Sequence, residues 1–177
     1  MVILGWCVYV GAASAQLSIK GFSLGQDLDE AAASAQMRCV PIKRSSRRLC
    51  LNPAKQLPEN ISTIAGVEAQ KVYLAGGPDN KVGRIHFGFR SDDFVQVRDA
   101  LIAKYPSIKC SDSVVQNRMG ASFDQTFCMG EVDGVELIIQ RREGDVTVGG
   151  LSATSASYLA VEQKDEDARA AKAKGDF

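Results

Sequence analysis

The chain has few of the residues that most often carry catalysis or bind metals. It contains one histidine, His86, among 177 residues. This count excludes a two-histidine metal site and leaves a Ser-His-Asp triad dependent on His86. No Cys-x-x-Cys motif is present, and Gly76-Gly77 and Gly149-Gly150 lack the spacing of a phosphate loop and indicate turns. We therefore expect no catalytic, metal or cofactor site.

An excess of one charge and a long apolar run in the body of the chain are also absent. Lys and Arg number 21 and Asp and Glu number 21. A neutral chain lacks the positive field with which proteins bind nucleic acid. No stretch after residue 15 is apolar for long enough to cross a bilayer. We expect a mature chain that binds no nucleic acid and is not integral to the membrane.

Residues 2–15 carry no charge and end on the small residues Ala13-Ser14-Ala15. This pattern is typical of a signal peptide over residues 1–15, although the usual basic residues before the apolar run are missing. Cys7 follows the apolar run as in lipoproteins, but Trp6 stands where lipid attachment requires a small residue. The alternative is that residues 1–15 form a buried element of a cytosolic protein. We predict export to the periplasm or the medium.

Export to an oxidising compartment predicts that the four remaining cysteines form two disulfides. Four cysteines allow three pairings. Proximity in the sequence favours Cys39 with Cys50 and Cys110 with Cys128, which would tie the first helix to the strand after it and the loop after the second helix to the last strands.

The first half predicts a helix followed by a hairpin. Asp27 is an N-cap candidate with Glu30 three residues later, and apolar residues then recur at helical spacing as far as Cys39, before Pro41. Alternation of apolar residues in 82–90 predicts a strand that pairs with residues 67–75 across a turn.

The second half repeats this pattern. Ser91-Asp92-Asp93 caps a predicted helix that ends before Pro106. Three strands follow, over 121–132, 135–141 and 146–152, with Asp133-Gly134 as a hairpin turn. From about Ser155 the pattern is helical and becomes increasingly polar.

These elements predict one α+β domain over residues 16–154 and a fraying C-terminal helix over 155–177. We expect an antiparallel sheet of two meanders continued edge to edge, with helices on one face. The order of elements indicates a doubled unit of one helix and several strands.

Three segments carry a resemblance to known proteins. Gly21-Phe22-Ser23-Leu24-Gly25 leads into the first helix, Phe94 to Pro106 form the second, and Asn117 to Phe123 follow. These segments resemble small secreted and periplasmic bacterial proteins whose α+β architecture is similar to that of beta-lactamase-inhibitor-like and outer-membrane-assembly-lipoprotein-like modules. The resemblance implies binding to another protein and transfers no contact residue.

Two candidate sites need separate interpretation. His86 alternates with Ile85, Phe87 and Phe89, so we predict that it lies on the open side of its strand as a surface residue. The basic turn between Cys39 and Cys50 is the best candidate contact loop for an acidic partner or anionic headgroups, with a solvated turn as the alternative. Its cations are Lys43, Arg44, Arg47 and Arg48.

The sequence favours a non-enzymatic protein-binding module, an inhibitor or an envelope accessory factor. The alternative is a small extracytoplasmic hydrolase that uses paired carboxylates. Its candidate residues lie in or near the predicted strands of the last third, at Asp124, Glu131 and Glu136. A cleft with converging acids would favour the hydrolase, and a shallow surface with exposed apolar residues would favour binding.

Overall fold

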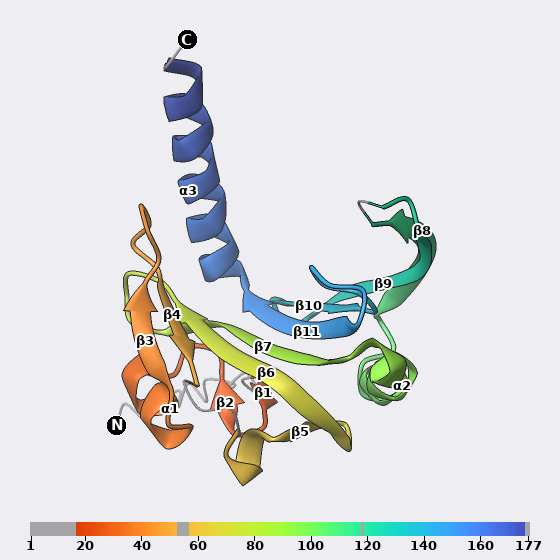
Figure 1. The fold of residues 1–177 in the computed structure, drawn as a ribbon. Coiled ribbons are helices and arrows are strands. Elements are labelled where there is room, and N and C mark those ends of the chain that lie inside the picture. Colours follow the sequence, from red (N-terminus) through yellow and green to blue (C-terminus); the bar gives the residue numbers. More distant parts are fainter. Residues whose placement is uncertain (1–16, 53–56, 118, 176–177) are drawn as a thin grey trace, which may run out of the picture.

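A computed structural model describes residues 17–52, 57–117 and 119–175. The signal peptide predicted over residues 1–15 lies outside them. The protein is an α+β fold built on an antiparallel sheet (Figure 1). Its first half contains β1 (Ser18–Ile19), β2 (Phe22–Ser23), α1 (Leu28–Ser34), β3 (Arg38–Pro41), β4 (Arg48–Leu51), β5 (Thr63–Ile64), β6 (Val67–Gly76) and β7 (Val82–Arg90), with a 3-10 turn at Glu59–Ile61.

The second half starts with a 3-10 turn at Ser91–Asp93 and ends with a long helix. Its elements are α2 (Phe94–Lys104), β8 (Lys109–Gln116), β9 (Ser122–Val132), β10 (Val135–Gln140), β11 (Val148–Ser155) and α3 (Ala156–Gly175). The described residues form a nine-stranded sheet in the order β3-β4-β6-β7-β11-β10-β9-β8, with β5 pairing to β6. The last strands of the two halves, β7 and β11, therefore meet at the centre of this sheet, and β3 and β8 form its edges.

Local chemistry explains the elements that were predicted. The Asp27 side chain accepts hydrogen bonds from the main-chain N–H groups of Asp29 and Glu30 and so caps α1. The hairpin of β6 and β7 forms as expected. Asp133 and Gly134 both have positive φ, as a two-residue hairpin turn between β9 and β10 requires.

The predicted extent of the first helix is wrong. The helix ends at Ser34, because Ala35 caps it and Gln36 adopts a φ of +53°. Cys39 therefore lies in strand β3 and forms a disulfide with Cys50 of the paired strand β4. Cys110 likewise lies in a strand, β8, and bonds to Cys128 of β9. Both disulfides have the pairing that proximity favours, but each joins two neighbouring strands.

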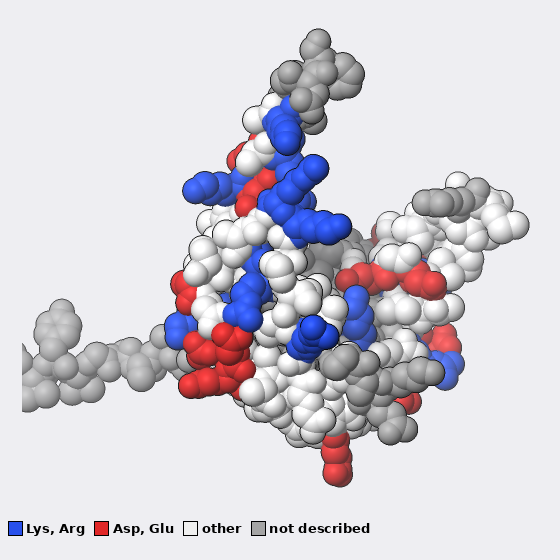
Figure 2. Space-filling view, turned by 60° about the vertical axis from the view of Figure 1, so that its left-hand side comes forward, with Lys and Arg blue, Asp and Glu red and all other residues white. Residues whose placement is uncertain are grey.

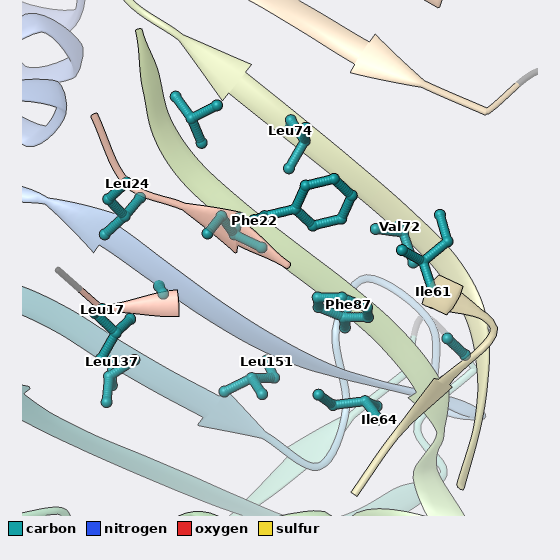
Figure 3. Packing of buried hydrophobic residues seen from close by; sticks show 14 of the residues in the cluster. Leu17, Phe22, Leu24, Ile61, Ile64, Val72, Leu74, Phe87, Leu137 and Leu151 are labelled. Carbon is teal, nitrogen blue, oxygen red and sulfur yellow. The ribbon is translucent and has the colours of Figure 1, made fainter. Parts of the chain in front are cut away.

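The hydrophobic core lies on one face of the sheet, under α1, α2 and the short strands. Buried residues from β6, β7, β10 and β11 meet those of the covering elements (Figure 3), among them Phe22, Ile61, Leu74, Phe87 and Leu137. Tyr158 of α3 is buried but packs outside this core, and α3 projects from the opposite side of the sheet (Figure 1). We call that opposite side the open face.

Candidate functional site

His86 lies on the open face, but it is buried. Its ring is opposite Tyr73 of β6 and Ser152 of β11 in the strand register, away from the core residues Ile85 and Phe87. The predicted side of the strand is therefore correct. The predicted surface exposure is wrong, because His86 is only 1% exposed.

Three side chains enclose the imidazole of His86. The Tyr73 ring stacks on it, with the ring centroids 4.3 Å apart and the planes at 12°. Ser152 Oγ lies 2.9 Å from His86 Nδ1, and Glu143 Oε2 lies 3.4 Å from Nε2. We call Tyr73, His86, Glu143 and Ser152 the His86 cluster.

Gly150 leaves room for this cluster. Gly88 and Gly150 face each other in the register of β7 and β11, next to His86 and Ser152. A Cβ atom on Gly150 would overlap the Glu143 carboxylate and approach the His86 ring, and one on Gly149 would overlap the Phe89 ring. Gly149-Gly150 is therefore part of strand β11 and not the predicted turn.

Glu143 reaches His86 from the loop over residues 141–147, which joins β10 to β11. The Arg142 side chain donates to the Asp124 carbonyl and to the Val146 carbonyl, and the Arg142 main-chain N–H donates to the Gln125 side chain. These bonds fix the loop, so the cover over His86 is an ordered part of the fold.

His86 is electrically neutral in the fold. Burial, with the charges of Lys71 and Arg84, lowers the pKa of His86 from 6.5 to about 3. These effects outweigh the nearby Glu143 carboxylate, which would favour the charged ring. Since a carboxylate can only accept, the tautomer with its proton on Nε2 matches both contacts, with Nδ1 accepting from the Ser152 hydroxyl.

Ser152, His86 and Glu143 are arranged like the nucleophile, base and orienting acid of a catalytic triad. The base, His86, is weak. Protonating a ring of pKa about 3 at pH 7 requires about 5 kcal/mol. General bases work best with a pKa near the working pH. The His86 cluster is therefore suited to fixing the 141–147 loop on the sheet and not to activating Ser152.

A second polar cluster attaches α3 to the open face. Glu162 pairs with Arg47 at 2.5 Å and with Arg84 at 2.6 Å, and Asp165 pairs with Arg47 at 2.8 Å. The guanidinium groups of Arg47 and Arg84 also lie over the Tyr158 ring. We call Arg47, Arg84, Tyr158, Glu162 and Asp165 the α3 anchor.

Gly83 provides the space for this anchor. Ala75 of β6 is opposite Arg84 and Gly76 is opposite Val82, so Gly83 is an extra residue in β7 and forms a bulge. A Cβ atom on Gly83 would overlap the Tyr158 ring. The glycine at the bulge thus lets the first turns of α3 pack on the sheet.

The four cations of the predicted basic contact loop have different environments in the fold. Arg47 is 7% exposed and belongs to the α3 anchor, and Arg48 pairs with Asp29 at 2.9 Å and donates to Asn80. Two of the four cations of the candidate contact loop are therefore paired within the chain, and the other two, Lys43 and Arg44, are exposed.

The carboxylates of the hydrolase alternative do not converge as a set. Glu131 and Glu136 are direct register partners on β9 and β10. Asp124 is seven residues from Glu131 along β9, a distance of roughly 23 Å in an extended strand. Glu131 is exposed and Glu136 half-buried. Within residues 17–52, 57–117 and 119–175, no group of three or more His, Cys, Asp and Glu side chains could hold a metal ion.

Two projecting elements flank the open face. The β8–β9 hairpin, which we call the arm, curves up on one side and α3 rises on the other (Figure 1). Figure 2 shows the surface hollowed between them, with Lys and Arg side chains along α3. Apolar side chains are exposed on the arm: Val114 is 64% exposed, Met119 92% and Met129 47%.

Sequence reasoning missed most partners in these clusters. Alternation in 82–90 places Arg84 and His86 on one face, but Tyr73, Glu143 and Ser152 come from other strands and a loop. The paired glycines at 149–150 were the available signal, because two glycines within a strand indicate a close approach by another group.

Comparisons with known proteins give this chain no relative. A scan of protein-family models, a search of curated proteins and a search of solved structures each found no match. In the part of the chain that the structure describes, no helix has the length and apolar character needed to span a bilayer.

Proposed function

We propose that this chain is a secreted or periplasmic protein-binding module without catalytic activity, an inhibitor or an accessory factor of the cell envelope. In this proposal the partner occupies the open face between α3 and the arm and contacts strand β8. The free edge of β8 is the observation that carries the proposal.

Strand β8 presents a long, regular edge. Its eight residues pair in continuous register with β9, and seven of them are exposed. The strand contains no proline or glycine. Among the described residues nothing pairs with its other side, and such an edge offers main-chain donors and acceptors to a further strand.

The opposite edge of the sheet is protected. Strand β3 has four residues and contains Pro41, which has no N–H to donate. Short length and proline are devices that prevent pairing between edges. Because the chain has these devices at β3 and lacks them at β8, the edge of β8 is suited to pairing.

The arm is also cross-linked. The Cys110–Cys128 disulfide joins β8 to β9, so less conformational entropy is lost when a partner orders the strand. The disulfides support an oxidising compartment, and the sequence resemblance to secreted and periplasmic binding modules agrees with this location.

The experiment compares binding by matched variants. The oxidised chain, Val114→Asp and Val95→Asp are immobilised and exposed to an envelope extract and medium of the producing cell. Both valines are at least half exposed, at 64% and 50%, but Val95 lies on α2, which is not part of the arm. We expect the wild type and Val95→Asp to retain the same protein, and Val114→Asp to retain at least tenfold less.

Two results would overturn the proposal. One is the absence of any saturable retention by the wild-type chain. The other is equal retention by Val114→Asp and Val95→Asp, which would remove the arm from the interface.

A further inference from the structure

An apolar groove lies on the core side of the sheet, beside α2. It has a volume of about 230 Å³ and is bounded by three separate elements, β1, β5 and α2. Ile64 and Leu151 lie at its base, where both belong to the buried core (Figure 3). The groove therefore opens from solvent into the hydrophobic interior.

One face of α2 forms a wall of this groove. Val97, Ala100, Leu101 and Lys104 line it, at the helical spacing i, i+3, i+4 and i+7. Val97 is buried, Leu101 is half-buried and Lys104 is exposed. The wall thus changes from apolar to cationic along the helix.

The mouth of the groove is positively charged. Lys20 and Lys104 line it, and no acidic residue does. Among the described residues neither lysine forms an ion pair. Lys20 Nζ donates to Thr63 Oγ1 at 3.2 Å, and Lys104 Nζ lies 5.1 Å from the centre of the Tyr105 ring.

Lys20 occupies an unusual position. It has a φ of +54° and precedes Gly21 in the turn between β1 and β2, where Asn, Asp or Gly is preferred. A long cationic side chain at this position is not explained by the turn. It is explained if the ammonium group has a role at the mouth of the groove.

We propose that this groove binds an aliphatic carboxylate, with the chain inside the groove and the carboxylate between Lys20 and Lys104. The larger cavity of about 450 Å³, near the start of α3, is lined by charges of both signs, Asp79, Lys81 and Asp133, and lacks this complementarity. The proposal concerns a different surface from the arm and does not depend on the proposed protein partner.

The volume limits the ligand. Cavities for drug-sized ligands measure about 300–1,000 Å³, so 230 Å³ suits a smaller molecule. It equals roughly eight water molecules at about 30 Å³ each, and a methylene group occupies a similar volume. We therefore expect a chain of about eight carbons to fill the groove.

The test is calorimetric titration of the oxidised chain with sodium butyrate, hexanoate, octanoate and decanoate. Burial of one methylene group is worth about 0.8 kcal/mol, or roughly fourfold in affinity. We expect such a gain for each added methylene up to octanoate and no further gain for decanoate. Octanol and octyltrimethylammonium should bind at least tenfold more weakly than octanoate.

Matched variants locate the binding. Ala100→Trp fills the groove from an exposed position and should abolish octanoate binding, whereas Ala103→Trp changes another exposed alanine of α2 that does not line it. Lys20→Asn with Lys104→Gln should reduce octanoate affinity to that of octanol, while Lys109→Gln should leave it unchanged. Equal binding of octanoate and octanol, equal behaviour of the two tryptophan variants, or no octanoate binding would overturn the proposal.

Discussion

At the scale of single residues, the neutral His86 links the fold to pH. Its pKa falls from 6.5 to about 3 on folding, so below pH 6.5 the unfolded chain binds a proton that the folded chain does not. Stability therefore rises with pH across this interval. The contribution is constant above pH 6.5.

We predict that the free energy of unfolding decreases by up to about 1.4 kcal/mol per pH unit because of His86 as the pH falls from 6.5 toward 3. His86→Gln removes the titrating group and keeps an acceptor for the Ser152 hydroxyl. Urea denaturation of both proteins between pH 4 and 7.5 measures the difference. Carboxyl groups with a lowered pKa, such as Asp29 and Asp165, are present in both proteins. Parallel stability curves would contradict the prediction.

Alternation in a strand predicts the side of a residue, but not what covers that side. The residues Ile85, Phe87 and Phe89 placed His86 correctly opposite the core. Its burial depends on Tyr73 in one neighbouring strand and on Glu143 in a loop more than fifty residues later. No local pattern in the sequence contains these tertiary contacts.

At the scale of elements, α3 is held to the body of the protein by its first turns. The helix has 20 residues, and the ion pairs of the α3 anchor reach only to Asp165. Arg47 contributes to both ion-paired carboxylates and to the Tyr158 ring. Its removal leaves Glu162 and Asp165, which are 22% and 15% exposed in their side chains, with fewer partners.

We predict that Arg47→Met lowers the free energy of unfolding by about 1–3 kcal/mol, the range for leaving a buried polar group without its hydrogen-bond partner. Arg44→Met, an exposed cation of the same loop, should change it by no more than about 0.5 kcal/mol. Denaturant unfolding measures both. Hydrogen exchange should also accelerate in residues 156–165 of Arg47→Met alone. Equal effects of the two substitutions would show that Arg47 does not anchor α3.

Elements with one face in the core were predicted well, and edge strands were not. The hairpin of β6 and β7 has a clear alternation, because one side of each strand packs on the core. Strands β3 and β8 are exposed on both sides, so no apolar period distinguishes them from loops. The residues of β8, from Lys109 to Gln116, therefore appeared as part of a connection.

At the scale of the whole molecule, the two disulfides occupy equivalent places in the sheet. Each joins an edge strand to its inner neighbour, Cys39–Cys50 at β3 and Cys110–Cys128 at β8. The linked residues are 11 and 18 positions apart. Chain-entropy arguments give similar stabilisation, about 3 kcal/mol each. The two edge strands that they join to the sheet differ in length: β3 has four residues and β8 has eight.

The inner strands β4 and β9 each pair with a further strand, and Cys50 and Cys128 both belong to the core. Strand β8 has β9 as its paired neighbour among the described residues and is exposed along its length. We therefore predict different consequences for the loss of each disulfide. Cys110→Ser with Cys128→Ala should accelerate hydrogen exchange across residues 109–116 while β6 and β7 stay protected. Cys39→Ser with Cys50→Ala should leave exchange in residues 109–116 unchanged.

The same pair of variants links stability to binding. If β8 must be ordered before its partner arrives, loss of Cys110–Cys128 should weaken binding at least tenfold, while loss of Cys39–Cys50 should not, although both variants lose similar stability. Mass-spectrometric hydrogen exchange and quantified retention of the partner measure the two effects on the same samples. Unchanged protection of β8 in the first variant would mean that main-chain pairing with β9 suffices to order the arm. The Cys110–Cys128 disulfide would then stabilise the folded state relative to the unfolded chain, but it would not order the edge of β8 for a partner.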